Sequence, residues 1–383
     1  MVLSLSQQIL ETIERSKQIL LTFRQNWSVD AVTAAVALAA VIERMEKAHT
    51  IAVSGFQLPA NLKFLPGAEK VRPALDSMRK FLIKLALRNT EIEEFTYDIV
   101  DGSLHIAITP RKGFFAPADV GTAPSEWRYD LVIVLDTPDL ESLGSFYVEH
   151  PEFFYSTPII NIDHTTHNEH FGRINMVDVT ASSTAEVVAE LLAQWDPKLM
   201  DETVATALLT GITAETESFR LPSVSPKTLS LASQLVSLGA KREEIVANLY
   251  RTKTVGALKL WGRALARLKQ DSLAQMVWSV MPASDFEKAG GDTADVIGVM
   301  DEMMGSIPRT RMALLLVEES PGGAVMAHAR TTDRQLDLRQ LFSAYSLTGD
   351  RTAIVATLTG KPLAVAEREV VDEIRGKLLS VRI

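Results

Sequence analysis

Two short apolar runs, each followed by an aspartate, constrain the fold of this chain more than any other feature. Residues 131–135 read Leu-Val-Ile-Val-Leu and precede Asp136, and residues 159–162 read Ile-Ile-Asn-Ile and precede Asp163 and His164. Such uninterrupted aliphatic runs are typical of parallel strands that are covered on both faces. Because ligands bind at the carboxyl edge of open α/β sheets, two acids and an imidazole there predict a divalent-metal site. The alternative, that these polar residues only cap the turns after the strands, stays open from the sequence.

The N-terminal part of the chain alternates strand and helix patterns. Residues 19–23 predict a strand, Ser28 is suited to cap an apolar helix over 29–45, and residues 50–54 predict a second strand. Strand, helix and strand in this order predict a right-handed βαβ unit. The fold class expected is therefore α/β, with an N-terminal doubly wound and mostly parallel sheet.

An insertion at about residues 80–115 interrupts this alternation. Residues 95–108 predict two strands around Asp101-Gly102, which is a strong hairpin signal. We expect an antiparallel insertion on the edge of the sheet. Three roles are open for it: covering an edge, forming an interface, or gating a cleft.

The remaining chain predicts a helical connector and a second domain. Prolines at 222 and 226 punctuate the end of the first domain, and residues 227–270 have helical spacing with many basic residues. We expect a first domain over 1–222, a solvated helical connector over 223–272, and a smaller C-terminal α/β domain over 273–383.

Composition excludes several classes of protein. The net charge of −9 argues against coating nucleic acid by bulk electrostatics, and the lack of cysteine excludes disulfides, thiolate metal sites and a cysteine nucleophile. The longest apolar run, residues 31–42, is far shorter than the ~20 residues that span a bilayer. The first residues lack the layout of a signal peptide, so a soluble cytoplasmic protein is expected.

The segment after the second apolar run carries a family resemblance. Residues 161–172 read Asn-Ile-Asp-His-Thr-Thr-His-Asn-Glu-His-Phe-Gly, and residues 178–186 contain Ser-Ser-Thr-Ala-Glu at the start of an expected helix. In order, spacing and element type, the chain resembles the DHH phosphoesterase superfamily. The resemblance is to the two-domain branch of nanoRNases and pAp phosphatases, in which a DHH domain precedes a DHHA1 domain, and it covers nearly the whole chain.

The resemblance implies hydrolysis of phosphoester bonds in short oligonucleotides or nucleotide phosphates with two divalent ions, usually Mn²⁺. The motifs of this chain depart from that pattern: Arg24 stands where the family has a histidine, Ser28 where it has an aspartate, and Thr165 where it has the second histidine. One ion site is then erased and one is kept, so a single Mn²⁺ or Mg²⁺ is expected, or none at all. The resemblance implies that the retained site contains Asp30, Asp136, His164 and Glu215.

The resemblance also implies roles for other residues. Asp163 and His164 are the expected catalytic pair. The glycine-rich segment that ends the family's second domain is reduced to one glycine in residues 346–353, and Gly322-Gly323 is as well explained by a hairpin turn. The residues assigned to substrate binding are Arg24, Asn168, Gly322, Gly323 and Arg330.

Several alternatives stay open. Arg24 either offsets carboxylate charge at the vacated ion position or is an exposed arginine at a strand end. His167 and His170 offer a zinc cluster with Asp163 and His164, although they fall on an expected loop, and no Gly-x-Ser-x-Gly elbow supports a serine hydrolase. The chain is either a working phosphoesterase or a catalytically impaired relative that binds a nucleotide or a protein. A homodimer is an expectation from the resemblance alone.

Overall fold

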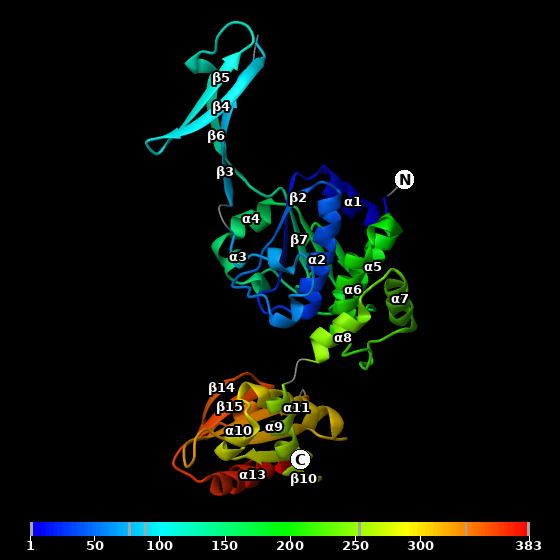
Figure 1. Ribbon diagram of the computed structural model, residues 1–383, viewed down its shortest axis with the longest axis vertical. Helices are drawn as coiled ribbons and strands as arrows, with labels where there is room; N and C mark the ends of the chain where they lie inside the picture. Colours follow the sequence, from blue (N-terminus) through cyan, green and yellow to red (C-terminus); the bar gives the residue numbers. More distant parts are fainter. Residues whose placement is uncertain (1–2, 76–77, 88–89, 252–253, 334, 381–383) are drawn as a thin grey trace. The chain divides into compact units, whose positions relative to one another are not determined.

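The structure, a computed structural model, describes residues 3–75, 78–87, 90–251, 254–333 and 335–380 (Figure 1). The chain divides after Arg251 into two compact units. Each unit has its own sheet and its own hydrophobic cores, so each is described by itself.

The first unit contains a five-stranded sheet in which every pair of neighbours is parallel, in the order β2-β1-β7-β8-β9. The chain runs from β1 outward to one edge, then returns to the other side of β1 and continues to the opposite edge. The point where the order reverses therefore lies between β1 and β7, and ligands of doubly wound folds bind outside such a reversal. The strands are β1 (Gln18–Phe23), β2 (Ala48–Ile51), β7 (Leu131–Leu135), β8 (Ile159–Asp163) and β9 (Ile174–Val177).

Both faces of this sheet are covered, which explains the uninterrupted apolar strands. In β7, Leu131, Ile133 and Leu135 belong to one core, whereas Val132 and Val134 face the other. The first face is covered by α1, α2, α5 and α6, with α7 and α8 outside, and the second by α3 and α4. The helices are α1 (Leu5–Arg15), α2 (Val29–Arg44), α3 (Ser145–Glu149), α4 (Pro151–Ser156), α5 (Thr184–Trp195), α6 (Glu202–Glu215), α7 (Pro226–Ser237) and α8 (Arg242–Tyr250).

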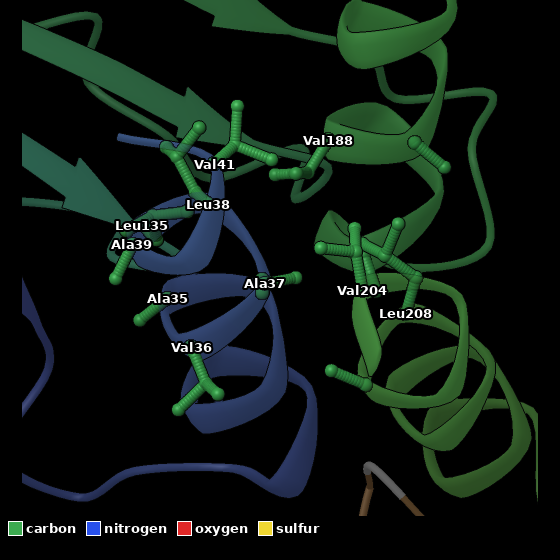
Figure 2. Close-up of a cluster of buried hydrophobic side chains, with 14 of the residues drawn as sticks. Ala35, Val36, Ala37, Leu38, Ala39, Val41, Leu135, Val188, Val204 and Leu208 are labelled. Atoms are coloured by element: carbon green, nitrogen blue, oxygen red, sulfur yellow. The ribbon is translucent and has the colours of Figure 1, made fainter. Parts of the chain in front are cut away.

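Helix α2 is apolar on nearly all sides because it lies between the sheet and two other helices. Figure 2 shows its side chains beside Val188 of α5 and Val204 and Leu208 of α6. The contact with α6 is close at Gly211, where an added Cβ would lie 2.7 Å from Ala185 Cβ and 2.8 Å from Asp30 Oδ1. Glycine at this position therefore lets the start of α2 approach α6.

The insertion is antiparallel, as expected, but it does not lie on the edge of the sheet. β3 (Arg79–Leu85) pairs with β6 (Val120–Trp127), and β4 (Ile92–Val100) pairs with β5 (Ser103–Pro110). Among the described residues, neither two-stranded sheet is hydrogen-bonded to the five-stranded one. The expectation that the insertion extends that sheet was wrong, and the insertion also ends later, at the end of β6.

The second unit is a six-stranded sheet in the order β10-β11-β12-β13-β15-β14, parallel only between β11 and β12. One face packs on α12 and α13 and the other on α9, α10 and α11. Its strands are β10 (Lys269–Asp271), β11 (Met276–Met281), β12 (Met312–Glu318), β13 (Val325–Thr331), β14 (Ser346–Gly349) and β15 (Ala353–Leu358). Its helices are α9 (Val255–Ala266), α10 (Ala283–Ala289), α11 (Ala294–Ser306), α12 (Leu338–Leu341) and α13 (Leu363–Ser380).

The expected connector over 223–272 is not a separate solvated unit. Leu235 of α7 and Ile245 of α8 are buried in the core of the first unit, whereas Leu260 and Ala264 of α9 are buried in the second. The helical prediction for 227–270 was right for α7, α8 and α9 and wrong for Lys269 and Gln270, which belong to β10. Each of these helices also buries apolar residues. Within the described part of the chain, no helix combines the length and apolarity needed to cross a bilayer.

Candidate metal centre

Three potential ligands meet at the reversal point of the N-terminal sheet. Asp136 follows β7, His164 follows β8, and Asp30 lies in the first turn of α2, the helix that follows β1. The His164 Nε2 lies 3.8 Å from Asp136 Oδ1 and 4.0 Å from Asp30 Oδ2. Of the residues that the structure describes, these three form the group whose ligand atoms lie within 4.8 Å of one another.

Asp30 is completely buried and is held by the N-terminus of α5. Its Oδ2 accepts a hydrogen bond from the Thr184 amide at 2.6 Å, and its Oδ1 accepts one from the Ala185 amide at 2.9 Å. Burial raises the pKa of the Asp30 carboxyl well above its usual range, repulsion from Asp136 and Glu215 adds to this, and the two amides oppose it. The negative charge on Asp30 is therefore costly, because the side chain is buried and lies near other carboxylates. A bound cation would offset that cost.

Asp136 takes a left-handed backbone conformation, with φ of 46°, immediately after its strand. This conformation is uncommon for a residue with a side chain and is found at functional sites. Its Oδ2 accepts hydrogen bonds from Arg24 Nη2 at 2.8 Å and Ser28 Oγ at 2.6 Å, and its Oδ1 faces His164. Burial raises the pKa of Asp136, and the neighbouring guanidinium and hydroxyl oppose that rise.

Arg24 brings a positively charged side chain to this site. Its side chain is 31% exposed and pairs with Asp136, so the interpretation of Arg24 as a solvated strand-end arginine was wrong. Its buried Nε has no hydrogen-bond partner among the described residues. Ser28 has a second role, since its Oγ also accepts from the Ala31 amide and caps α2. The two substituted positions therefore bind the carboxylate directly.

Asp163 and Asn168 hold the loop that carries His164. The buried Asp163 carboxylate accepts from the His164 amide at 2.6 Å, the Thr165 amide at 3.0 Å, the Thr165 Oγ1 at 3.0 Å and the Asn168 Nδ2 at 2.7 Å. Asn168 also donates to the Thr137 carbonyl, which follows Asp136. The fourfold-bonded Asp163 thus orients His164, and Asn168 links the loops that follow β7 and β8.

Glu215 lies close to this cluster but outside it. It is the last residue of α6, its pKa is raised by burial and by Asp136, and His164 and Arg24 oppose that rise. Asp30 and Glu215 come from helices, whereas Asp136 and His164 follow strands. Close packing of α2 and α6 at Gly211 brings the acids of these two helices to the edge of the sheet where β7 and β8 end.

The part of the chain that carries Asp30, Asp136 and His164 matches a protein-family model. The model described as the DHH family, N-terminal domain, matches residues 18–212, slightly more than half of the chain. The chain belongs to the DHH family.

Curated relatives of this DHH chain include a bifunctional oligoribonuclease and PAP phosphatase from Thermus thermophilus, 26% identical over 57% of this chain and 64% of the relative. A cyclic-di-AMP phosphodiesterase from Listeria monocytogenes is 28% identical over 49% of this chain and 32% of the relative. The chain therefore spans less than two thirds of the length of these relatives. The structure is also similar to that of an exopolyphosphatase-related protein from Bacteroides fragilis, with a TM-score of 0.65, 16% identity, and coverage of 98% of this chain and 97% of that one. That likeness shows that both units share a known fold.

The residues of the DHH centre fit a divalent cation. Two buried carboxylates and an imidazole are ligands that Mn²⁺ and Mg²⁺ accept, and both carboxylates carry a raised pKa that a cation would lower. His167 and His170 lie on the loop after β8 and outside this group; His170 Nδ1 lies 3.0 Å from the Asn168 carbonyl. The separate zinc cluster is therefore not formed by the residues that the structure describes.

The second unit contains a cavity of about 190 Å³ around the expected substrate residue Arg330. His328, Thr348 and Gly349 line the same cavity. Gly322 and Gly323 do not: they form the turn between β12 and β13, where the Gly322 amide donates to Glu318 Oε1. The hairpin interpretation of the two glycines is the one observed.

Four residues that contribute to these sites were not predicted from the sequence. The Thr184 and Ala185 amides hold Asp30, and Gly211 allows the helices to approach; Gly211 in an otherwise apolar helix was the available signal. His328 was also missed. Its Nε2 is buried with no hydrogen-bond partner among the described residues, and burial lowers the pKa of the ring, so the imidazole is a neutral group facing the cavity.

Proposed function

We propose that this chain is a metal-dependent phosphoesterase that hydrolyses phosphoester bonds in short oligonucleotides or nucleotide phosphates, with one divalent ion instead of two. The observation that carries the proposal is the group formed by Asp30, Asp136 and His164 at the reversal point of the sheet. The names of the relatives, which include oligoribonucleotides, PAP and cyclic-di-AMP, supply the substrate class.

Asp30, Asp136 and His164 would hold the ion, Mn²⁺ or Mg²⁺, with Glu215 close by. When bound, such an ion polarises a phosphoryl oxygen and makes water more acidic. Asp163 has a positioning role, because its four hydrogen bonds fix the loop from which His164 projects.

Arg24 would supply the positive charge that relatives obtain from a second ion. Its Nη2 neutralises one oxygen of Asp136, whereas its buried Nε–H has no hydrogen-bond partner among the described residues. A guanidinium suits this role because it is always charged and presents several donors in one plane.

In the second unit, Arg330 and His328 line a cavity that would suit a ligand with anionic and hydrogen-bonding groups, such as a nucleotide. A neutral imidazole can exchange one hydrogen bond with a nucleobase or a phosphate oxygen, and the arginine favours an anionic group. Gly349, with φ of 121°, leaves the backbone beside this cavity without a side chain.

Hydrolysis of the three substrates that the names of the two relatives give tests the proposal. Short 5′-labelled oligoribonucleotides, PAP and cyclic-di-AMP are incubated with the full chain and Mn²⁺, with Asp136→Asn as the comparison. We expect product from at least one substrate and none above background from the variant. Equal background rates for both proteins would remove the enzyme proposal.

The number of ions has its own test. Changing Arg24 to His and Ser28 to Asp in one double variant recreates the ligand pattern that the family resemblance assigns to the lost site. Titration calorimetry should give one Mn²⁺ per unaltered chain and two per double variant. Two ions on the unaltered chain would contradict the role given to Arg24.

A second candidate is a nucleotide-binding relative without turnover. The observation that favours it is the occupation of Asp136 Oδ2 by both Arg24 and Ser28, which leaves that carboxylate fewer free lone pairs for a metal. Binding of a substrate by calorimetry without product formation over long incubation would select this candidate.

A further inference from the structure

The insertion carries an amphipathic two-stranded ribbon, defined as residues 92–110. β4 and β5 lie side by side, drawn in cyan in Figure 1, and turn at Asp101 and Gly102, both with positive φ. Side chains of successive residues in a strand point to opposite faces, so the cross-strand register decides which residues share a face.

One face of the ribbon is entirely apolar. Three consecutive cross-strand pairs on this face are Phe95 with Ile108, Tyr97 with Ile106, and Ile99 with Leu104. On the opposite face, the pairs Glu94 with Thr109, Thr96 with Ala107, and Asp98 with His105 are polar or small, and Val100 with Ser103 follows beside the turn. This alternation over the three central pairs is the pattern of a sheet with one buried face.

The apolar face is nevertheless open. Its exposed fractions are 56% for Phe95, 69% for Tyr97, 70% for Ile99, 58% for Leu104 and 40% for Ile106. These side chains leave apolar surface on the order of 500 Å² in contact with water, as much as the largest patch of a typical monomer. A two-stranded hairpin with an open face is only marginally stable in water, so the pattern requires something to cover it.

We propose that the apolar face of the ribbon is a dimerisation surface that packs against the same face of a second copy of this chain. None of the six side chains on the face is charged, so two copies related by a two-fold axis bury no charge against each other. The open area is most of the roughly 800 Å² that each partner buries in a standard interface. Two such ribbons would form a small sandwich, with each supplying the layer that the other lacks.

Charge argues against the other occupants. The ribbon and its edges carry Glu91, Glu93, Glu94, Asp98 and Asp101, with only Arg111 and Lys112 to balance them. An acidic ribbon is repelled by nucleic acid and by anionic lipid. Asp98 and Glu94 point to the face opposite the apolar one, where they would stay in water in the dimer.

The mass of the full chain in solution, measured by analytical ultracentrifugation over a range of concentrations, is the first test. We expect the unaltered chain to reach twice the chain mass of 42.1 kDa. Tyr97→Glu places a charge at the centre of the apolar face and should weaken dimerisation about tenfold or more. The matched control is Thr96→Glu, which adds the same charge to the adjacent residue on the opposite face and should leave the dissociation constant unchanged. A chain that stays monomeric, or a control that dissociates equally, overturns the proposal.

A chemical cross-link provides a second test that does not depend on a destabilising charge. The chain has no cysteine, so Tyr97→Cys and Thr96→Cys each introduce the only thiol. Because Tyr97 and Ile106 form the middle pair, a two-fold axis would pass close to them, and a short bis-maleimide should link two Tyr97→Cys chains and not two Thr96→Cys chains. Equal linking of both variants would overturn the proposal.

Two other results would also overturn it by naming a different occupant. A monomer whose ribbon amides are protected from hydrogen exchange would mean that the chain covers its own ribbon. A monomer that floats with phosphatidylcholine vesicles, and loses this on Tyr97→Glu, would mean that lipid covers it.

Discussion

The candidate metal centre and the ribbon depart from the usual burial of side chains in opposite directions. At the centre, Asp30 and Asp136 are buried carboxylates whose pKa values are raised by burial. On the ribbon, large apolar side chains such as Tyr97 and Ile99 are more than two-thirds exposed. Each departure raises the free energy of the isolated chain, and each would be relieved by a different ligand: a cation at the centre and an apolar surface on the ribbon.

The two regions also differ in how they are built. The centre is fixed by helices packed within van der Waals contact and by hydrogen bonds between residues more than 100 positions apart, such as Arg24 to Asp136. The ribbon is held by one hairpin, and the structure describes no hydrogen-bonded strand beside it. Substitutions that overpack the helices beside the centre should therefore lower the stability of the fold, whereas changes on the ribbon should disturb association only.

The largest expected effect comes from Asp136→Asn. Losing one ligand charge should reduce turnover on the order of 10³-fold, since metal ions contribute several kcal/mol and each 1.4 kcal/mol is about tenfold. Asparagine tolerates the left-handed backbone that Asp136 adopts, so folding should be preserved, which circular dichroism checks. The matched control is Asp178→Asn, a carboxyl that follows β9 and accepts from the Thr180 amide. A comparable loss in the control would contradict the assignment of the centre.

Gly211→Ala should have the next largest effect. The added methyl group would meet Ala185 and Asp30, and overpacking of this kind lowers the free energy of unfolding by about 1–3 kcal/mol. Urea denaturation measures the change, and Mn²⁺ affinity should fall with it because Asp30 moves. Gly262→Ala in α9, where an added Cβ meets nothing within 4 Å, should instead stabilise its unit by roughly 0.5–1 kcal/mol. Equal effects would show that packing at Gly211 is not what positions the acid.

The stabilisation by Mn²⁺ should depend on pH. The pKa values of Asp30, Asp136 and Glu215 are raised in the folded chain, so their charged forms cost stability above the folded pKa values and cost nothing below the unfolded values near 4. An added cation offsets that cost, and it must displace protons at lower pH. Thermal unfolding with and without Mn²⁺ should therefore show a larger rise in Tm at pH 7.5 than at pH 5.

The difference in Tm with and without Mn²⁺ at each pH is the useful quantity, because other carboxyls respond to pH in the opposite sense. The pKa values of Asp178 and Asp285 are lowered, so their contribution to stability is lost as the pH falls through the folded values. Asp136→Asn should remove most of the Mn²⁺ effect at both pH values. An equal rise in Tm at pH 5 and pH 7.5 would mean that the ion binds elsewhere.

The smallest expected effect comes from removing the ribbon. Replacing residues 91–111 with an Asn-Gly turn joins ends that already lie close, since the Arg111 amide donates to the Glu91 carbonyl at 2.8 Å. Measured at concentrations where the chain is monomeric, Tm should change by only a few degrees, because no strand of the five-stranded sheet is lost. A large loss of stability would show that the ribbon packs on its own chain.

Local patterns were enough to predict most of the elements. The apolar runs of β7 and β8, the hairpin at Asp101, the cap at Ser28 and the helix start after Ser183 all occur as expected. These signals lie within a few residues of one another, and they depend on the period of the backbone and on which side chains can bond a free amide. The family resemblance added the motif positions, which no periodicity could supply.

Long-range contacts account for what the sequence could not predict. The connector helices were expected to be solvated, yet α7 and α8 bury Leu235 and Ile245 in one unit while α9 buries Leu260 in the other. Asp30 was expected in the site, but the Ala185 amide that fixes it lies 155 residues away and was not predicted. The exposure of the ribbon's apolar face could not be predicted either, because the alternating sequence is the same whether or not a partner covers that face.

The sequence by itself determined that this protein has two parallel strands ending in acids, an antiparallel hairpin insertion and the motif residues that carry the DHH resemblance. Only the tertiary structure decided that Arg24 bonds Asp136, that Glu215 stands outside the ligand group, and that the ribbon is left uncovered. The physical reason is that periodicity and capping act over one turn or one strand. Which side chains share a site depends instead on how closely distant elements pack, as α2 and α6 do at Gly211.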